Sequence, residues 1–167
     1  TAILATIDDH EVWNDFAGFG PLGAGDVALF GSPAGTPSND SARFEIGLQA
    51  FQEWNAIEDR RNPGADDATR EAGEWDLYRY TVDGEAATFV LDARSLRDPQ
   101  IAGWNFTDAD VGRFLAQAWD PPRTMLGEGQ LARLMADLLD ADAKGVAWKF
   151  IAVPEPIQNY GLLQAQD

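Results

Sequence analysis

Four consecutive ionisable side chains stand near the start of the chain, directly after an apolar run. Residues 2–7 are expected to form a buried strand, and Asp8-Asp9-His10-Glu11 follow it, with His10 the only histidine in 167 residues. Loops at the carboxyl ends of strands aim polar groups into a shared crevice. Two carboxylates and an imidazole there suit a divalent metal together with proton transfer. A solvated turn after the strand is the alternative that local chemistry leaves open.

The elements that must position these residues alternate between strand and helix patterns. A helix is expected from Asp40 or Ser41 to Trp54, and a hairpin from the runs 77–82 and 86–91 around Asp83-Gly84. A second helix is expected to begin at Thr107 and to end before Pro121-Pro122. A leucine-rich helix and a buried strand over 146–153 follow. This order indicates an α/β (α+β) fold in a single domain over residues 1–167.

Three apolar stripes are expected to face the core of the domain. They have helical spacing, which places their members on one side of each helix. Their members are Phe44, Leu48 and Phe51; Val111, Phe114, Leu115 and Ala118; and Leu131, Leu134, Met135, Leu138 and Leu139.

Residues 16–37 are rich in glycine and proline and are expected to form a long surface loop. The loop directly follows the ionisable stretch, so it could form one wall of a cleft. A disordered insertion is the alternative.

Composition excludes several classes of protein. The 28 acidic and 12 basic residues give a net charge of −16, which argues against binding to nucleic acid or to anionic membrane surfaces. The chain has no cysteine, so it holds no disulfide or thiolate metal site. No stretch approaches the roughly 18 to 20 apolar residues of a membrane span.

Three stretches resemble, in order, the PhoD-like (alkaline phosphatase D) family of calcineurin-like metallophosphoesterases. They are Asp8-Asp9-His10-Glu11-Val12 with Asn14-Asp15 following, the Leu-Asp-x-Arg-x-x-Arg-Asp element at 91–98, and the Leu-Gly-x-x-Gln element at 126–130 with the later Trp-Lys-x-Ile at 148–151. The resemblance implies a metal-dependent phosphatase or phosphodiesterase acting on a small phosphoester. It also implies that the chain is the middle section of a four-layer αββα sandwich with two sheets.

The resemblance also implies roles for individual residues. Asp9 would be a metal ligand, and His10 would stabilise or protonate the departing alkoxide. Asp8 and Glu11 would be supports. Asp92 and Arg94 lie two apart, so in extended chain they would share a face. We expect them to brace the site through a salt bridge, with direct phosphate contact as the alternative.

The metals implied are a pair, with calcium and iron favoured by the carboxylate at Asp9, and zinc and manganese as further candidates. The family usually has tryptophan where this chain has Ile7. It also takes ligands from an Asp-x-x-Tyr segment, a cysteine and a Gly-Asp-x-His segment, none of which is in this sequence. We therefore expect the missing ligands to come from other segments of the same or another chain, and this chain alone to be a poor enzyme.

Two other functions remain open from the sequence. One is a catalytically silent acidic scaffold for protein interaction. The other is a phospholipase D-type phosphodiesterase, with Trp13, Phe16 and Phe19 available to contact an acyl or aryl group, although core packing would explain these aromatics equally well. The resemblance alone indicates a periplasmic or extracellular location.

Overall fold

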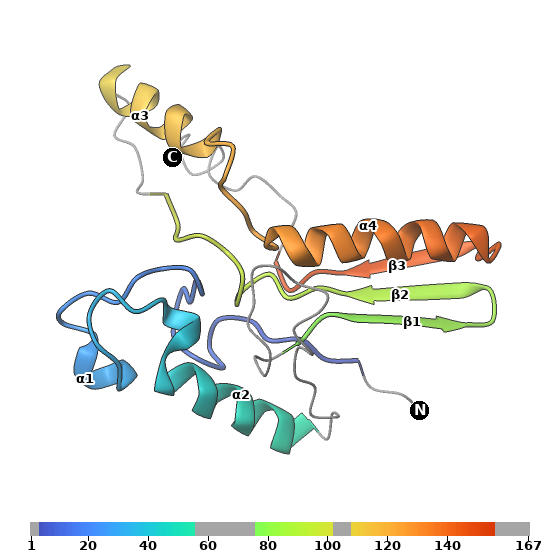
Figure 1. Cartoon of the computed structure of the whole chain (residues 1–167), viewed down its shortest axis with the longest axis horizontal. Helices are drawn as coiled ribbons and strands as arrows, with labels where there is room; N and C mark the ends of the chain where they lie inside the picture. Colours follow the sequence, from blue (N-terminus) through green and yellow to red (C-terminus); the bar gives the residue numbers. More distant parts are fainter. Residues whose placement is uncertain (1–3, 56–75, 102–107, 156–167) are drawn as a thin grey trace, which may run out of the picture.

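The structure of the protein is a computed structural model that describes residues 4–55, 76–101 and 108–155. It contains four α-helices, one 3-10 helix and three strands within these ranges (Figure 1). In chain order they are α1 (Val27–Phe30), η1 (Ser38–Asp40), α2 (Ala42–Asn55), β1 (Arg79–Asp83), β2 (Ala86–Val90), α3 (Asp108–Ala118), α4 (Glu128–Ala143) and β3 (Trp148–Ala152).

The three strands form one mixed sheet in the order β1-β2-β3. The expected hairpin is confirmed, with β1 antiparallel to β2 and Asp83 opposite Ala86. Its two turn residues are therefore Gly84 and Glu85, one position later than expected. Gly84 has a φ of 58°, which glycine adopts without a steric penalty. β3 lies parallel to β2, which requires a crossover connection.

Helix α4 runs along β3 and covers one face of the sheet (Figure 1). Leu134, Leu138 and Ala141 pack there with residues of all three strands or their ends, including Tyr78, Phe89 and Val153. The expected apolar stripe is thus only partly core. Leu131, Met135 and Leu139 on the same helix are 46%, 60% and 71% exposed, because they lie on a flank that points past the sheet.

A second core lies around α2 and the N-terminal segment. The expected cap is confirmed at Ser41, whose Oγ accepts a hydrogen bond from the Phe44 amide at 3.2 Å. Phe44, Leu48 and Phe51 are all buried, as their spacing predicts. Ile7, Val12 and Phe16 pack against them, so the residues on both sides of the ionisable stretch are anchored on α2.

Two sequence expectations about strands and helices are wrong. Residues 4–7, the described part of the expected first strand, join no sheet: Leu4 is 44% exposed, and the Thr6 hydroxyl donates to the Leu91 carbonyl after β2 at 2.8 Å. The apolar stripe of α3 is not fully buried: Leu115 is 45% exposed, Val111, Phe114 and Ala118 are half-buried, and the helix projects away from the sheet (Figure 1). The expected start of that helix, Thr107, lies outside the described residues.

The described chain is consistent with α+β, but it contains a single sheet. The two-sheet, four-layer sandwich, and the assignment of one domain with an inserted loop, stay predictions. None of the helices in the described ranges is long and apolar enough to cross a membrane.

The glycine-rich segment 16–37 is mostly turns, with α1 within it and a single bridge between Pro21 and Pro37. Its start packs tightly on the loop that follows β2. The amide of Gly18 donates to the Arg94 carbonyl at 2.9 Å, and a Cβ on Gly18 would lie 1.8 Å from the Ser95 carbonyl oxygen. Glycine is therefore required at this contact.

We expect Gly18→Ala to lower the free energy of unfolding by about 3 kcal/mol, the upper end of the usual cost of overpacking. Gly25→Ala is the matched control, because no heavy atom lies within 4 Å of the Cβ it would add. Chemical denaturation of both variants measures the difference. Equal midpoints would mean that the two loops can separate at no cost.

Candidate active site

The ionisable stretch forms a tight turn in the structure. The carbonyl of Asp9 accepts hydrogen bonds from the amides of Val12 and Trp13 at 3.0 and 2.8 Å. Glu11 closes the turn, because its carboxylate accepts the Asp8 amide at 2.9 Å. Glu11 thus lies where a supporting residue would be expected, bonded to the backbone beside Asp9.

Asp9 and His10 are in direct contact. Asp9 is 7% exposed, and its Oδ1 lies 2.8 Å from Nδ1 of His10. Its Oδ2 accepts the amide of Asp15 at 2.7 Å. The imidazole itself is 74% exposed, so a buried carboxylate holds one edge of an accessible ring.

This contact determines which ring nitrogen is available for chemistry. A carboxylate can only accept, so Nδ1 carries the proton and donates it to Asp9. Nε2 is then the atom that can accept or release a proton at the surface. The geometry leaves His10 able to act as an acid or a base at one defined nitrogen.

Asp9 stays ionised in spite of its burial. Burial alone would raise the pKa of Asp9, but the Asp15 amide, His10 and the Arg94 guanidinium together hold that pKa below the ordinary value of 3.8. A negative charge is therefore maintained beside the imidazole at neutral pH.

Arg94 joins this turn to the loop after β2. Its Nη2 lies 2.7 Å from Oδ1 of Asp8 and 4.0 Å from Oδ1 of Asp9. The same nitrogen lies 2.7 Å from Oε1 of Glu155, which also pairs with Arg97 at 2.6 Å. A bracing salt bridge was expected of Asp92 and Arg94; the partner that Arg94 has in the turn is Asp8.

Asp92 and Arg94 were expected to share a face of an extended chain. This expectation is wrong, because the chain bends between them. Residues 91–94 leave the strand after Val90, and the Oδ1 of Asp92 accepts the amides of Arg94 and Ser95 at 3.0 and 2.8 Å. Asp92 is 2% exposed and shapes the loop that presents Arg94.

The second and third motifs meet at this loop. The side chain of Gln130 donates to the Asp92 carbonyl and accepts the Asp92 amide, both at 2.8 Å. Gly127, with a φ of 73°, brings the start of α4 against Leu96. The Leu-Asp-x-Arg and Leu-Gly-x-x-Gln elements therefore form one packed unit that carries Arg94.

The described residues do not by themselves make a metal site. No group of three or more His, Asp or Glu side chains able to hold an ion occurs among them. Both oxygens of Asp9 already have partners, and Asp8 is paired with Arg94. Asp9 could supply one ligand, so a metal pair needs donors beyond those described.

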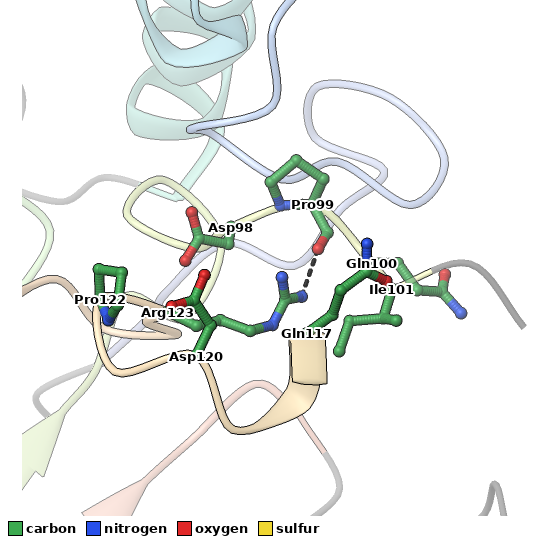
Figure 2. Close-up of a pocket in the computed structure, with 8 residues that line it drawn as sticks. All are labelled: Asp98, Pro99, Gln100, Ile101, Gln117, Asp120, Pro122 and Arg123. Carbon is green, nitrogen blue, oxygen red and sulfur yellow. Dashed lines mark hydrogen bonds between the residues drawn. The ribbon is translucent and has the colours of Figure 1, made fainter. Parts of the chain in front are cut away.

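Three hollows of the described surface lie near the site, and Glu11 is the one predicted site residue that lines any of them, in a hollow of about 430 Å³ between the turn and α2. A pocket of about 500 Å³ lies between residues 98–101 and the end of α3 (Figure 2), where Arg123 donates to the Pro99 carbonyl. A hollow of about 220 Å³ next to Trp13 and Asp15 shares Pro99 and Gln100 with it. None of Asp8, Asp9, His10, Asp92 and Arg94 lines any of these three hollows.

The roles of three residues in this network were not predicted from the sequence, although two of them, Asp15 and Arg97, stand in stretches that resemble the family. Glu155 lies far from the turn along the chain, and no spacing pattern links it to its partner Arg97. Asp15 has a φ of 57°, which is uncommon for a residue with a side chain, and this conformation aims its amide at Asp9. The signal for Asp15 in the sequence is its place in the first stretch that resembles the family.

We expect the free energy of unfolding of the Asp9→Asn variant to fall less at acid pH than that of the wild type. A carboxyl with a depressed pKa stabilises the fold above its unfolded pKa, about 3.9, and that stability is lost as the pH falls through the folded value. The wild type should therefore lose stability below about pH 4 more steeply than the variant. Denaturation at a series of pH values measures this, and parallel curves would contradict it.

Comparisons with known proteins agree with the motifs. A sequence model described as PhoD-like phosphatase matches residues 1–167. A solved structure titled "Structure of PhoD" superposes with a TM-score of 0.57 at 23% identity, which supports the fold. The match covers 86% of this chain and 23% of that one, so the chain spans about a quarter of its length. No match was found among the curated proteins. The full-length family match shows that this chain belongs to the PhoD-like phosphatases.

Proposed function

We propose that this chain carries part of the active site of a metal-dependent phosphoester hydrolase. The observation that carries the proposal is the 2.8 Å contact between Oδ1 of Asp9 and Nδ1 of His10. It combines a buried carboxylate with an exposed imidazole in the first of the three family motifs.

His10 is proposed to act on the leaving group. When a phosphoester is cleaved, the departing oxygen becomes an alkoxide that needs a proton or a hydrogen bond. Asp9 accepts from Nδ1 and stabilises the protonated ring, so Nε2 can donate to that oxygen. The 74% exposure of His10 leaves Nε2 accessible to a substrate.

Arg94 and Asp8 are proposed to hold the turn in place. The guanidinium is 11% exposed and spans Asp8, Glu155 and the Phe16 carbonyl. Because its donors are engaged by protein acceptors, bracing fits Arg94 better than direct contact with a phosphate. Glu11 and Asp92 support the backbone on either side.

The metal pair would supply the polarisation of the phosphate and the activation of water. Asp9 is the only proposed ligand in this chain, and we propose that the other ligands come from segments of the same or another chain. Calcium and iron remain the favoured metals, with zinc and manganese as further candidates.

The substrate class is proposed to be a small phosphomonoester or phosphodiester. A phospholipase D-type substrate is a second candidate, favoured by Trp13, which is 44% exposed beside the hollow at Asp15. An apolar group attached to the phosphate could contact that ring. A periplasmic or extracellular location is proposed from the family resemblance.

The experiment uses a PhoD-like phosphatase chain that carries residues 1–167 together with the remaining ligands. Hydrolysis of a chromogenic phosphomonoester, a chromogenic phosphodiester and a choline phospholipid is measured side by side. Turnover of at least one supports the proposal, and the preferred substrate decides among the three classes. A well-folded, metal-loaded protein that hydrolyses none of them would instead favour the silent acidic scaffold.

A further inference from the structure

Helix α2 contacts the turn of Asp9 and His10 through an arginine near its N-terminus. Arg43 is half-buried, and its Nε donates to the Val12 carbonyl at 2.7 Å. The donor is charged, so this bond belongs to the stronger class of hydrogen bonds. Arg43 stands outside the three family motifs, and no spacing in the sequence links it to the turn.

The bond reaches the site through two rigid peptide groups. The carbonyl of Val12 and the amide of Trp13 belong to one planar peptide group, and that amide donates to the Asp9 carbonyl at 2.8 Å. The Asp9 carbonyl in turn belongs to the peptide group that links Asp9 to His10. Two hydrogen bonds therefore connect Arg43 to the peptide bond between the buried carboxylate and the imidazole.

Two aromatic rings hold the guanidinium of Arg43 in this position. Its central carbon lies 4.8 Å from the centroid of the Trp13 ring and 5.9 Å from the centroid of the Phe30 ring. The two rings pack edge to face, with their centroids 6.4 Å apart. Both distances to the guanidinium are within the range in which a cation is attracted to an aromatic face. Trp13 is thus held by its ring as well as by its backbone.

One turn further along α2, Gly47 packs on the backbone of the same turn. A Cβ at Gly47 would lie 2.5 Å from the Glu11 carbonyl oxygen, closer than such atoms approach. Residues i and i+4 lie on one face of a helix, so Arg43 and Gly47 meet successive residues of the turn. Close packing at Glu11 and a charged donor at Val12 therefore fix the turn on α2.

We infer that Arg43 is a positioning residue for the reaction proposed for His10, and that it acts through the backbone of residues 12–13 and through Asp9. The Oδ1 of Asp9 orients the imidazole by accepting from Nδ1 of His10. A turn that has lost its donor from α2 presents Nε2 less precisely to the departing oxygen. The inference rests on the proposed function, because only an acid at His10 gives this orientation a role in catalysis.

The first test compares Arg43→Ala with the wild type in a PhoD-like phosphatase that carries residues 1–167. For a phosphodiester of an aliphatic alcohol, we expect turnover to fall about tenfold with KM unchanged, the lower end of the loss when a residue that supports a metal ligand is replaced. A phosphodiester of an acidic phenol should lose less, because its leaving group needs no proton from His10. Equal losses on both substrates would overturn the inference.

A double variant determines whether the two residues act together. If Arg43 acts through His10, adding Arg43→Ala to His10→Ala should lower turnover no further. A second loss of about tenfold in the His10→Ala background would overturn the inference, because Arg43 would then act independently of the imidazole.

Ser41→Ala is the matched control for a weakened α2. The Ser41 hydroxyl donates to the Ser38 carbonyl and accepts the Phe44 amide, and neither partner belongs to the turn. Loss of this cap should lower the melting temperature and leave turnover unchanged. If turnover falls in step with melting temperature in both Ser41→Ala and Arg43→Ala, the role of Arg43 is merely structural and the inference is overturned.

Nuclear magnetic resonance tests the positioning without an activity assay. The ring nitrogen signals of His10, identified by their loss in His10→Ala, report which nitrogen of the neutral ring carries the proton. The bond to Asp9 favours Nδ1 in the wild type. We expect Arg43→Ala to move the proton population toward Nε2, and Ser41→Ala to leave it unchanged.

An unchanged proton population in Arg43→Ala would overturn the inference, whatever the activity of the protein. A shifted population in a protein that hydrolyses no phosphoester would support the positioning of His10 by Arg43 and would overturn the proposed function alone.

Discussion

Replacing His10 by alanine is expected to lower the turnover of a phosphodiester by about a hundredfold or more, the usual loss when a general acid is removed. The side chain is 74% exposed, so the variant should fold as the wild type does. The measurement is the turnover number of a PhoD-like phosphatase that carries this segment, with the melting temperature determined in parallel.

Gln49→Ala is a suitable control, because Gln49 is an exposed residue of α2 whose side chain donates a hydrogen bond to Glu53, away from the turn. Its turnover should be unchanged. A substrate with an acidic phenol as leaving group should lose less in His10→Ala, since its leaving group needs no proton. Unchanged turnover on a substrate with a poor leaving group would remove His10 from the mechanism.

Arg94→Ala is expected to lower the free energy of unfolding by about 3 kcal/mol, the cost of removing one partner from a largely buried ion pair. The guanidinium is 11% exposed, and Glu155 beside it is 17% exposed. The variant leaves Asp8 and Glu155 without this cation and removes a donor to the Phe16 carbonyl. Denaturation with urea measures the change.

Two further variants distinguish the loss of the hydrogen bonds of Arg94 from the loss of a positive charge. Arg94→Lys keeps the charge but has a single nitrogen in place of the planar fork, so we expect it to recover less than half of the loss. Arg113→Ala, on α3, removes an arginine that is 37% exposed and should cost less than about 0.5 kcal/mol. A loss in Arg94→Ala as small as that in Arg113→Ala would contradict the bracing role.

Local patterns predicted the elements whose signals lie within a few residues. The Ser41 cap and the stripe at Phe44, Leu48 and Phe51 gave α2 almost to the residue. Alternation around Gly84 gave the hairpin, with the turn shifted by one position because Asp83 pairs with Ala86.

Periodicity alone could not decide what each apolar stripe faces. Leu134 and Leu131 belong to the same pattern on α4, yet Leu134 is 8% exposed and Leu131 is 46% exposed. The difference depends on which flank of the helix lies over a strand, which is a tertiary property. The same reason accounts for the wrong prediction of a strand over residues 2–7, whose described part has no neighbouring strand.

In the candidate site too, local motifs predicted the residues that are adjacent in sequence but not those that tertiary structure brings together. The motif identified the turn and the pair of Asp9 and His10, which are adjacent in sequence. Glu155 enters the site only because β3 ends beside the loop after β2, and a contact across 61 positions to Arg94 leaves no local pattern.

The most direct test of the central claim is the effect of a chelator on phosphodiester turnover. The measurement uses a PhoD-like phosphatase carrying residues 1–167, assayed before and after chelation and again after adding calcium, iron, zinc or manganese. The proposed function predicts that turnover is lost on chelation and returns with one of these metals. Turnover that is unchanged after complete removal of metal, confirmed by elemental analysis, would contradict it.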